Sequence, residues 1–214
     1  SQESGHGGNL FCERTQVNPR RQGTHRPCLA QCPKQENTMA KLNIQPTDRE
    51  RVMRDDDFIV SKTDLKGRIT YANKIFSEFA GLQEHEFLNK QHNIVRHPDM
   101  PRCVFKLLWD HIQAGKEIFA FVKNMHSDGS YYWVFANVTP SHDQNGNIVG
   151  YYSVRRKPNP KAIPHVAALY RQLLQIEQSG VSRDGMQAAL AHVGQLLNQK
   201  GMSYERFILD LQSL

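Results

Sequence analysis

Hydrophobic and polar positions follow two different periods along the chain, and the change between them predicts most of its elements. Short runs of apolar and β-branched residues at 58–61 and 68–71 predict two strands. The residues from Asp64 to Gly67 have turn chemistry, so we expect a hairpin. Apolar residues then recur at helical spacing in 74–80, where Asn73 is placed to begin a helix and Gly81 to end it.

The middle of the chain changes from helical to extended patterns. A short helix is expected at 84–88 and a longer one at 101–114, with Asp99 as its N-cap and Pro101 in its first turn. Three segments rich in aromatic and β-branched residues come next, at 117–126, 131–139 and 147–156. With the first hairpin they predict a five-stranded antiparallel sheet with helices on one face, an α+β fold.

Three amphipathic helices are expected after Pro160. The first ends before Gly180, the second ends before Gly201, and Ser203 caps the third. Their apolar stripes must pack on another surface. A helical hairpin, a dimer face that uses the two-heptad pattern of the first stripe, and packing back on the sheet all satisfy the pattern.

Composition narrows the class of protein. Hydrophobic residues make up 39% of the 214 positions, enough for a core, and no apolar run approaches the ~18 residues of a membrane span. The start also lacks the apolar stretch of a signal peptide, so we expect a soluble, cytoplasmic protein. The net charge is +6, but the basic residues are scattered. The one short run, 155–157, is expected to be solvated, and no nucleic-acid partner is predicted.

The first 38 residues differ from the rest of the chain. They hold few large apolar residues and many Arg, Gln, Pro and Gly, as is typical of a disordered tail. Three cysteines lie there, but the position of Cys12 fits no standard zinc finger, so no metal site is predicted. Met39 is a candidate start, with 1–38 a tag or upstream segment. Residues 39–160 form the expected domain and 161–214 a helical extension; Cys103 is expected to be a small packed residue.

The loop from Asn93 to Pro101 concentrates the candidate chemistry. Pro98 and Pro101 restrict their own backbone and that of the preceding residue, so the loop is expected to be stiff. It holds a guanidinium, an imidazole and a carboxylate within four positions, directly before an apolar helix. The loop therefore suits one wall of a ligand pocket; alternatively it only caps the helix and Arg96 is solvated.

The predicted order of elements resembles that of a PAS sensor domain, and so do two stretches, DLKGRITYAN at 64–73 and DGSYYW at 128–133. A closer resemblance joins NIVRHPDMP at 93–101 and VKN at 122–124 to the PAS domain of bacterial aerotaxis receptors. It covers about residues 39–174. It implies a PAS fold that holds FAD without a covalent bond and reports redox state or oxygen.

The resemblance also implies a set of residues in or near the flavin site: Asn73, Arg96, His97, Asp99, Phe105, Trp109 and Asn124. The guanidinium of Arg96 suits the FAD pyrophosphate, with His97 as a second donor and Asp99 holding either of them in place.

The other members of this set have roles of two kinds. An amide at Asn124 suits the mixed donors and acceptors of the pyrimidine edge of the flavin ring. Asn73 has the rival role of a helix N-cap. The wide apolar face of the 101–114 helix allows Phe105 and Trp109 either to face a flat aromatic ligand or to fill the core.

The resemblance implies a signal-transduction protein that is not an enzyme. Its expected partner is a chemoreceptor or a histidine kinase, with a homodimer as a further possibility. Two alternatives stay open: a haem PAS oxygen sensor with His92, His97 or His111 as axial ligand, and a cofactor-free interaction module. A flavin enzyme is not predicted, because no nucleophile with an adjacent base is legible.

Overall fold

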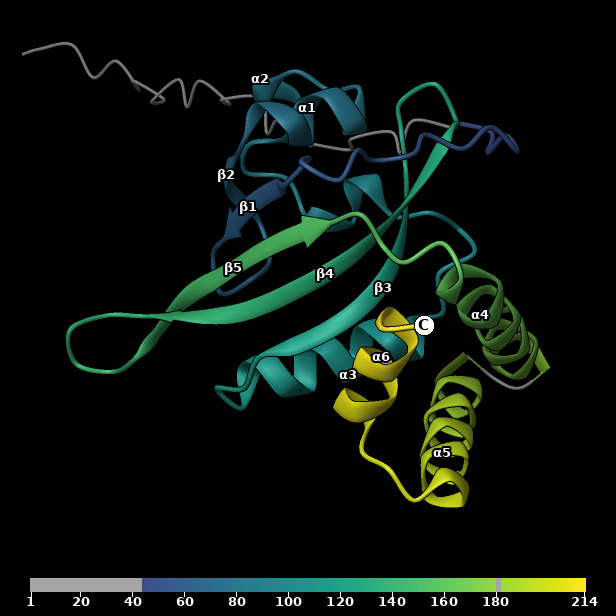
Figure 1. Ribbon diagram of the computed structural model, residues 1–214. Helices are drawn as coiled ribbons and strands as arrows, with labels where there is room; N and C mark the ends of the chain where they lie inside the picture. Colours follow the sequence, from purple (N-terminus) through teal and green to yellow (C-terminus); the bar gives the residue numbers. More distant parts are fainter. Residues whose placement is uncertain (1–43, 180–181) are drawn as a thin grey trace, which may run out of the picture. The chain divides into compact units, whose positions relative to one another are not determined.

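The computed structural model describes residues 44–179 and 182–214 (Figure 1). The predictions for residues 1–38 lie outside the described residues. Within the described ranges, no helix combines the length and the apolarity that crossing a membrane requires.

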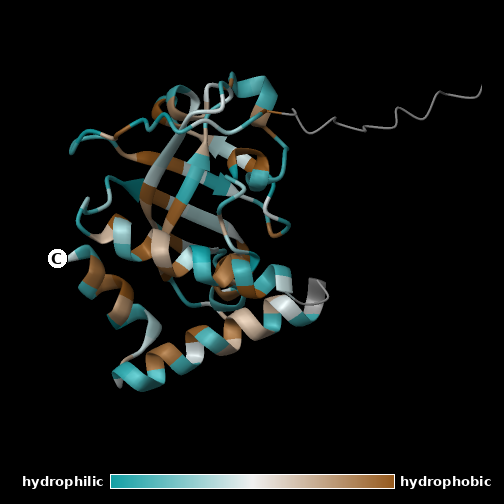
Figure 2. Ribbon diagram, turned by 90° about the vertical axis from the view of Figure 1, so that its right-hand side faces the viewer, coloured by the Kyte–Doolittle hydropathy of each residue, from teal (hydrophilic) through white to brown (hydrophobic). Residues whose placement is uncertain are grey.

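A five-stranded antiparallel sheet forms the centre of the described structure, as predicted. The strands are β1 (Ile59–Thr63), β2 (Ile69–Ala72), β3 (Ile118–Met125), β4 (Tyr131–His142) and β5 (Ile148–Arg156). Their order in the sheet is β2-β1-β5-β4-β3. Strand β1 therefore pairs with β2, its partner in the first hairpin, and with β5, the last strand of the chain. The central strands β3 and β4 are buried along most of their length. Figure 2 shows hydrophobic positions concentrated on the strands of the sheet.

Four helical segments lie between β2 and β3. They are α1 (Lys74–Ala80), α2 (Glu84–Phe87), a 3-10 turn (His92–Val95) and α3 (Arg102–Gln113). The predicted cap of α1 is confirmed: Oδ1 of Asn73 accepts the amide of Phe76 at 3.1 Å. The same side chain also bonds the strand before it, accepting the amide of Val60 at 3.0 Å and donating to the carbonyl of Phe58 at 2.7 Å. Asn73 therefore fixes α1 to the start of β1.

The prediction that Asp99 caps α3 is wrong. The N-cap is Pro101, which has no side-chain donor or acceptor, and Asp99 instead accepts a 2.7 Å bond from Nζ of Lys123. The first amides of α3 are bonded by the carboxylate of Glu177, which lies 75 positions further along the chain. A cap supplied from such a distance has no local sequence pattern.

The three predicted C-terminal helices are confirmed as α4 (Ala162–Ser179), α5 (Ser182–Lys200) and α6 (Tyr204–Gln212). They pack on one another and on the sheet: α4 contacts α5, α5 contacts α3, and α6 contacts β3. The hydroxyl of Tyr170 donates to the carbonyl of Phe121 at 2.7 Å, and Ile208 joins the same apolar cluster. Two of the three expected arrangements, the hairpin and packing back on the sheet, thus occur together.

Substitution of Asn73 tests the joint between α1 and β1. We expect Asn73→Ala to lower the free energy of unfolding by about 1–2 kcal/mol, because it removes a helix cap and two further hydrogen bonds. Asn73→Asp keeps the capping oxygen and loses only the bond to Phe58, so its loss should be smaller. Urea unfolding measures both, and equal stability of all three proteins would contradict the assignment.

Candidate functional site

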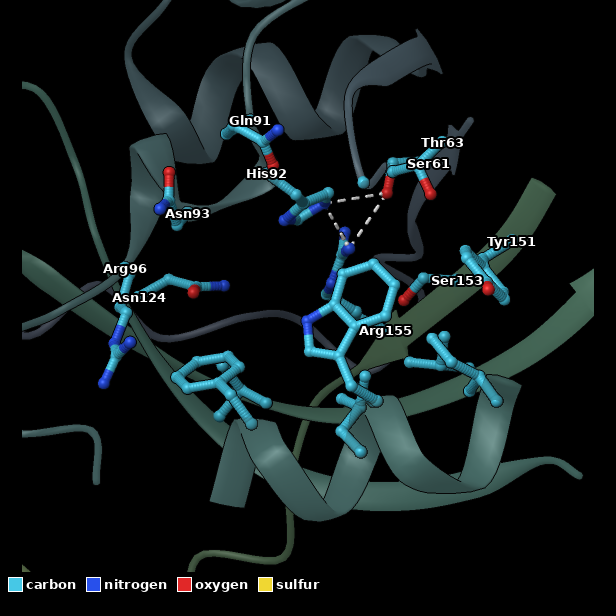
Figure 3. A pocket seen from close by; sticks show the side chains of 18 residues that line it. Ser61, Thr63, Gln91, His92, Asn93, Arg96, Asn124, Tyr151, Ser153 and Arg155 are labelled. Carbon is cyan, nitrogen blue, oxygen red and sulfur yellow. Dashed lines mark hydrogen bonds between the residues drawn. The ribbon is translucent and has the colours of Figure 1, made fainter. Parts of the chain in front are cut away.

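A cavity of about 230 Å³ lies between α3, the loop before it and one face of the sheet (Figure 3). One part of its lining is apolar and comes from α3 and the central strands: Phe105, Leu108, Trp109, Ile112, Val122, Ala136 and Val138. The other part is polar and comes mainly from β1, β5 and the 3-10 turn: Ser61, Thr63, Gln91, His92, Asn93, Arg96, Asn124, Tyr151, Ser153 and Arg155.

The apolar wall is one face of α3. Phe105, Leu108 and Trp109 follow helical spacing, so one face of the helix presents all three to the cavity. The indole of Trp109 meets the ring of Tyr151 edge to face, with ring centroids 5.4 Å apart. On the other side it approaches Gly67, where an added Cβ would lie 2.9 Å from the indole and where φ is +76°. Glycine suits position 67 for two reasons: the turn requires a positive φ, and the indole of Trp109 leaves no room for a side chain.

Three side chains form a hydrogen-bonded triangle at the polar end (Figure 3). Nη2 of Arg155 lies 2.9 Å from Oγ of Ser61 and 2.7 Å from Nε2 of His92, and the last two atoms are 3.0 Å apart. Because a guanidinium only donates, Nε2 of His92 must be the unprotonated acceptor. The network implies a neutral imidazole with its proton on Nδ1.

The burial of Arg155 corrects the prediction that 155–157 is solvated. Ser153 and Arg155 share one face of β5 and turn inward, and Arg155 is only 5% exposed. Burial lowers the pKa of Arg155 to about 10, so the group is still cationic at neutral pH. Among the described residues no carboxylate forms an ion pair with it, and its Nη1 has no hydrogen-bond partner. Within residues 44–179 and 182–214, this cation therefore contributes a positive charge beside the cavity that no carboxylate pairs with.

Two further observations describe the polar wall. Oγ of Ser153 is buried and, within the described ranges, has no hydrogen-bond partner. Burial and the neighbouring Arg155 cation lower the pKa of His92 to about 3. The wall therefore offers a cation and a hydroxyl with unused hydrogen-bonding capacity, and His92 does not gain a proton near neutral pH.

The loop before α3 is fixed to β3 at the edge of the cavity. The backbone of Arg96 pairs with that of Asn124, and Sδ of Met100 accepts the amide of Lys123 at 3.1 Å. Nη2 of Arg96 donates to the carbonyl of Met100 at 2.7 Å, and the guanidinium lies 4.4 Å from the ring centroid of Phe105. The amide of Asn124 points inward, and Arg96 lies on the side opposite Tyr151 (Figure 3).

The structure brings four of the seven predicted site residues together around the cavity: Arg96, Phe105, Trp109 and Asn124. The other three do not line it. Asn73 caps α1, and Asp99 bonds Lys123 on the surface side. His97 is 3% exposed and accepts the amide of Asp99 on Nδ1 at 3.1 Å, while burial lowers its pKa to about 4.

Sequence reasoning missed the polar group contributed by β1 and β5: Ser61, Ser153 and Arg155. Because successive side chains of a strand point to opposite faces, Tyr151, Ser153 and Arg155 share one face of β5. This spacing could have indicated from the sequence that Arg155 points inward. His92 was considered only as a haem ligand, yet its Nε2 already bonds Ser61 and Arg155. His111, another haem candidate, does not line the cavity, and its Nδ1 lies 2.8 Å from the carbonyl of Leu107.

Comparison with known proteins agrees with this arrangement. Residues 69–155 match the family model of the PAS fold. The matched region therefore has the α+β architecture of the PAS fold. It is 37% identical over 127 residues to the aerotaxis receptor of Escherichia coli, a match that covers 59% of this chain and 25% of the receptor. It is 26% identical over 97 residues to a nitrogen fixation regulatory protein of Klebsiella pneumoniae, covering 45% of this chain and 20% of that protein.

Solved light-oxygen-voltage domains also align with the chain. One, from a study of a flavin analogue in such a domain, has 20% identity and a TM-score of 0.47, covering 50% of this chain and 82% of that one. The dark structure of the LOV domain of the blue-light photoreceptor Aureochrome1 has 25% identity and a TM-score of 0.45, covering 59% and 99%.

The neutral state of His92 predicts a pH dependence of stability. The pKa of His92 is about 3 in the folded protein and ordinary, near 6.5, in the unfolded chain, so only the unfolded state gains this proton between those values. The stability contribution is therefore complete above pH 6.5 and is lost as the pH falls toward 3. Between pH 7.5 and 5.0 we expect a loss of about 2 kcal/mol from this group.

Urea unfolding of His92→Gln at the two pH values isolates that contribution. The variant should lose less stability than the wild type on acidification, while His85→Gln, at an exposed position, should follow the wild type. Parallel loss in all three proteins would show that His92 is not held neutral.

Proposed function

We propose that the chain is a non-catalytic sensor that binds FAD in the cavity and reports redox state or oxygen to a protein partner. One observation carries this proposal: the cation of Arg155 is buried against the cavity with no carboxylate partner in the described part of the chain. Burial of a cation is costly unless the cation is paired, and a ligand that carries or gains negative charge supplies a partner. A flavin ring gains negative charge when it is reduced.

The lining fits the ring system of a flavin. Phe105, Leu108 and Trp109 offer an apolar face for a flat aromatic group. The pyrimidine edge of the ring mixes donors and acceptors, and the amide of Asn124 supplies both. The Nη1 of Arg155 and the hydroxyl of Ser153, unpaired within the described residues, supply further donors at the polar wall.

The size of the cavity limits how much of the cofactor it encloses. Its 230 Å³ is below the ~300–1,000 Å³ of typical pockets for whole drug-sized ligands. The enclosed space suits a ring system, while the rest of a dinucleotide lies toward the edge, where Arg96 is half-buried. A guanidinium at that position suits the pyrophosphate.

The similarity to an aerotaxis receptor supports the sensing role and the choice of FAD. The matched region is a quarter of that receptor, so the partner is inferred from the class of protein: a chemoreceptor or a histidine kinase. The proposed location is the cytoplasm, where such partners have their signalling regions. Bound FAD would supply the redox chemistry, and the residues of this chain bind it, orient it and set the charge around it.

The first test is an absorption spectrum of the protein refolded with excess FAD. Two flavin bands in the visible and near-ultraviolet that remain after gel filtration are the expected result. A Soret band in the protein as purified would instead identify the haem alternative, and a visible region without features would contradict both cofactor proposals.

The second test removes the buried cation. We expect Arg155→Met to weaken FAD binding by at least roughly tenfold, since hydrogen bonds to charged groups contribute about 1.5–3 kcal/mol. It should also shift the midpoint potential to more negative values, because the reduced ring loses a neighbouring positive charge. Arg155→Lys should keep part of both properties.

Arg156→Met is the matched control, because Arg156 is the adjacent residue and is exposed on the other face of β5. FAD titration and spectroelectrochemistry measure the two properties. The apoprotein of Arg155→Met should stay folded, since the substitution removes a buried charge that no carboxylate of the described residues compensates. Wild-type affinity and potential in Arg155→Met would refute the assignment.

A further inference from the structure

The carboxylate of Glu177, on α4, is bonded to the first turn of α3. Oε1 accepts the amide of Cys103 at 2.7 Å and Oε2 accepts the amide of Arg102 at 3.0 Å, so both oxygens take part. Nε of Arg102 lies 3.3 Å from Oε2. These amides are among the four at a helix start that have no partner within the helix, and a negative charge there is favoured by the helix dipole.

This contact is buried and electrostatically strong. Glu177 is 6% exposed, an unusual position for a glutamate in a long amphipathic helix. Burial raises the pKa of Glu177, but the amide bonds from Cys103 and Arg102 outweigh burial and leave the pKa below its ordinary value. The group is therefore a carboxylate at neutral pH, and its bonds to α3 are charge-assisted.

The same contact lies on the helix that forms the apolar wall of the cavity. Phe105 and Trp109 face the cavity from α3, one and two turns beyond the amides that Glu177 accepts. Arg96, at the cavity edge, is also within electrostatic range of Glu177, which raises the pKa of the guanidinium against the dominant effect of burial. A displacement of α3 or a change at Arg96 therefore acts directly on Glu177.

On its other side Glu177 is fixed to α5. Gly185 packs on the backbone of Glu177 so closely that an added Cβ would lie 2.4 Å from the carbonyl oxygen. At the far end of the helical group, the amide of Asn159 bonds Oε1 of Gln212 at 3.0 Å, which joins the start of α4 to the end of α6. The three C-terminal helices are thus tied to one another, and Glu177 joins the group to α3.

We propose that Glu177 is the coupling residue through which α3 transmits the state of the cavity to the C-terminal helices. This inference rests on the proposed function only for the nature of the ligand; the mechanical link is a property of the chain alone. Hydrogen bonds weaken steeply when distance and angle change, so a small shift of α3 loosens both bonds of Glu177 together. The C-terminal helices then change their packing against α3 and become the output of the sensor.

A double-mutant cycle without any ligand tests the link. Phe105→Leu perturbs the cavity side of α3, and Glu177→Gln removes the charge with little change of shape. The readout is amide hydrogen exchange in α4, measured for both single variants, the double variant and the wild type. We expect Glu177→Gln to speed exchange in the first turn of α3 and in α4 at least roughly tenfold, as for loss of hydrogen bonds to a charged acceptor.

The coupling is measured by comparing the effect of Phe105→Leu with and without the carboxylate of Glu177. Phe105→Leu should speed exchange in α4 when Glu177 is present and should add little in the Glu177→Gln background. Equal effects of Phe105→Leu in both backgrounds, or an unchanged α4 in Glu177→Gln, would overturn the proposal. Glu78→Gln, an exposed glutamate on α1, is the matched control and should leave α4 unchanged.

Two measurements keep the outcomes distinct. Exchange in β4 and β5 shows whether Glu177→Gln is folded. If it is not, Glu177→Asp, which keeps the charge on a shorter side chain, replaces it in the cycle.

FAD titration is performed separately, so absence of flavin binding would refute the proposed function while the cycle still decides the coupling. In protein that binds FAD, reduction should alter exchange in α4 of the wild type and not of Glu177→Gln; equal changes would also overturn the coupling.

Discussion

The guanidinium of Arg155 is held on the inner face of the sheet by Ser61 and His92, and no carboxylate among the described residues neutralises it. This charge decides the chemistry around it. Together with burial, it keeps the pKa of His92 low, and its own Nη1 has no hydrogen-bond partner in the described part of the chain. Burial of a charge without a pairing carboxylate is unfavourable, and the hydrogen bonds to Ser61 and His92 offset part of that cost.

Helix α3 connects this wall to the rest of the molecule because it is apolar on more than one side. Phe105 and Trp109 face the cavity, whereas Cys103, Val104 and Leu107 line the junction with the C-terminal helices. The wide apolar face predicted from the sequence thus faces two neighbours. One part lines the cavity, and the other packs against the C-terminal helices. A helix packed on two sides transmits a displacement from one side to the other, while the side chains of Lys106 and Asp110 of α3 stay partly exposed on its remaining face.

Most of the fold could be predicted from local patterns. The spacing of Ile75, Phe76 and Phe79 with Asn73 and Gly81 at the ends predicted α1. The segments rich in aromatic and β-branched residues predicted the strands within a few residues. The site was only partly predictable. The motif around Arg96 indicated one edge of the cavity, but Arg155 was assigned to solvent because a short basic run at a strand end usually is exposed. Long-range partners such as Glu177 for Cys103 have no local pattern at all.

The two faces of β3 and β4 are covered by different parts of the structure. This difference shows which segments the folded domain includes. Val122 and Asn124 face the cavity, while Phe121 and Trp133 are covered by the C-terminal helices, the latter with its ring centroid 6.1 Å from that of Tyr170. The family match ends at residue 155, before any of these helices begins. The unit that matches the family is therefore smaller than the unit that buries its own apolar surface. A fragment cut at the family boundary would expose this face of the sheet to water, so the helices after the PAS fold belong to the core of this chain.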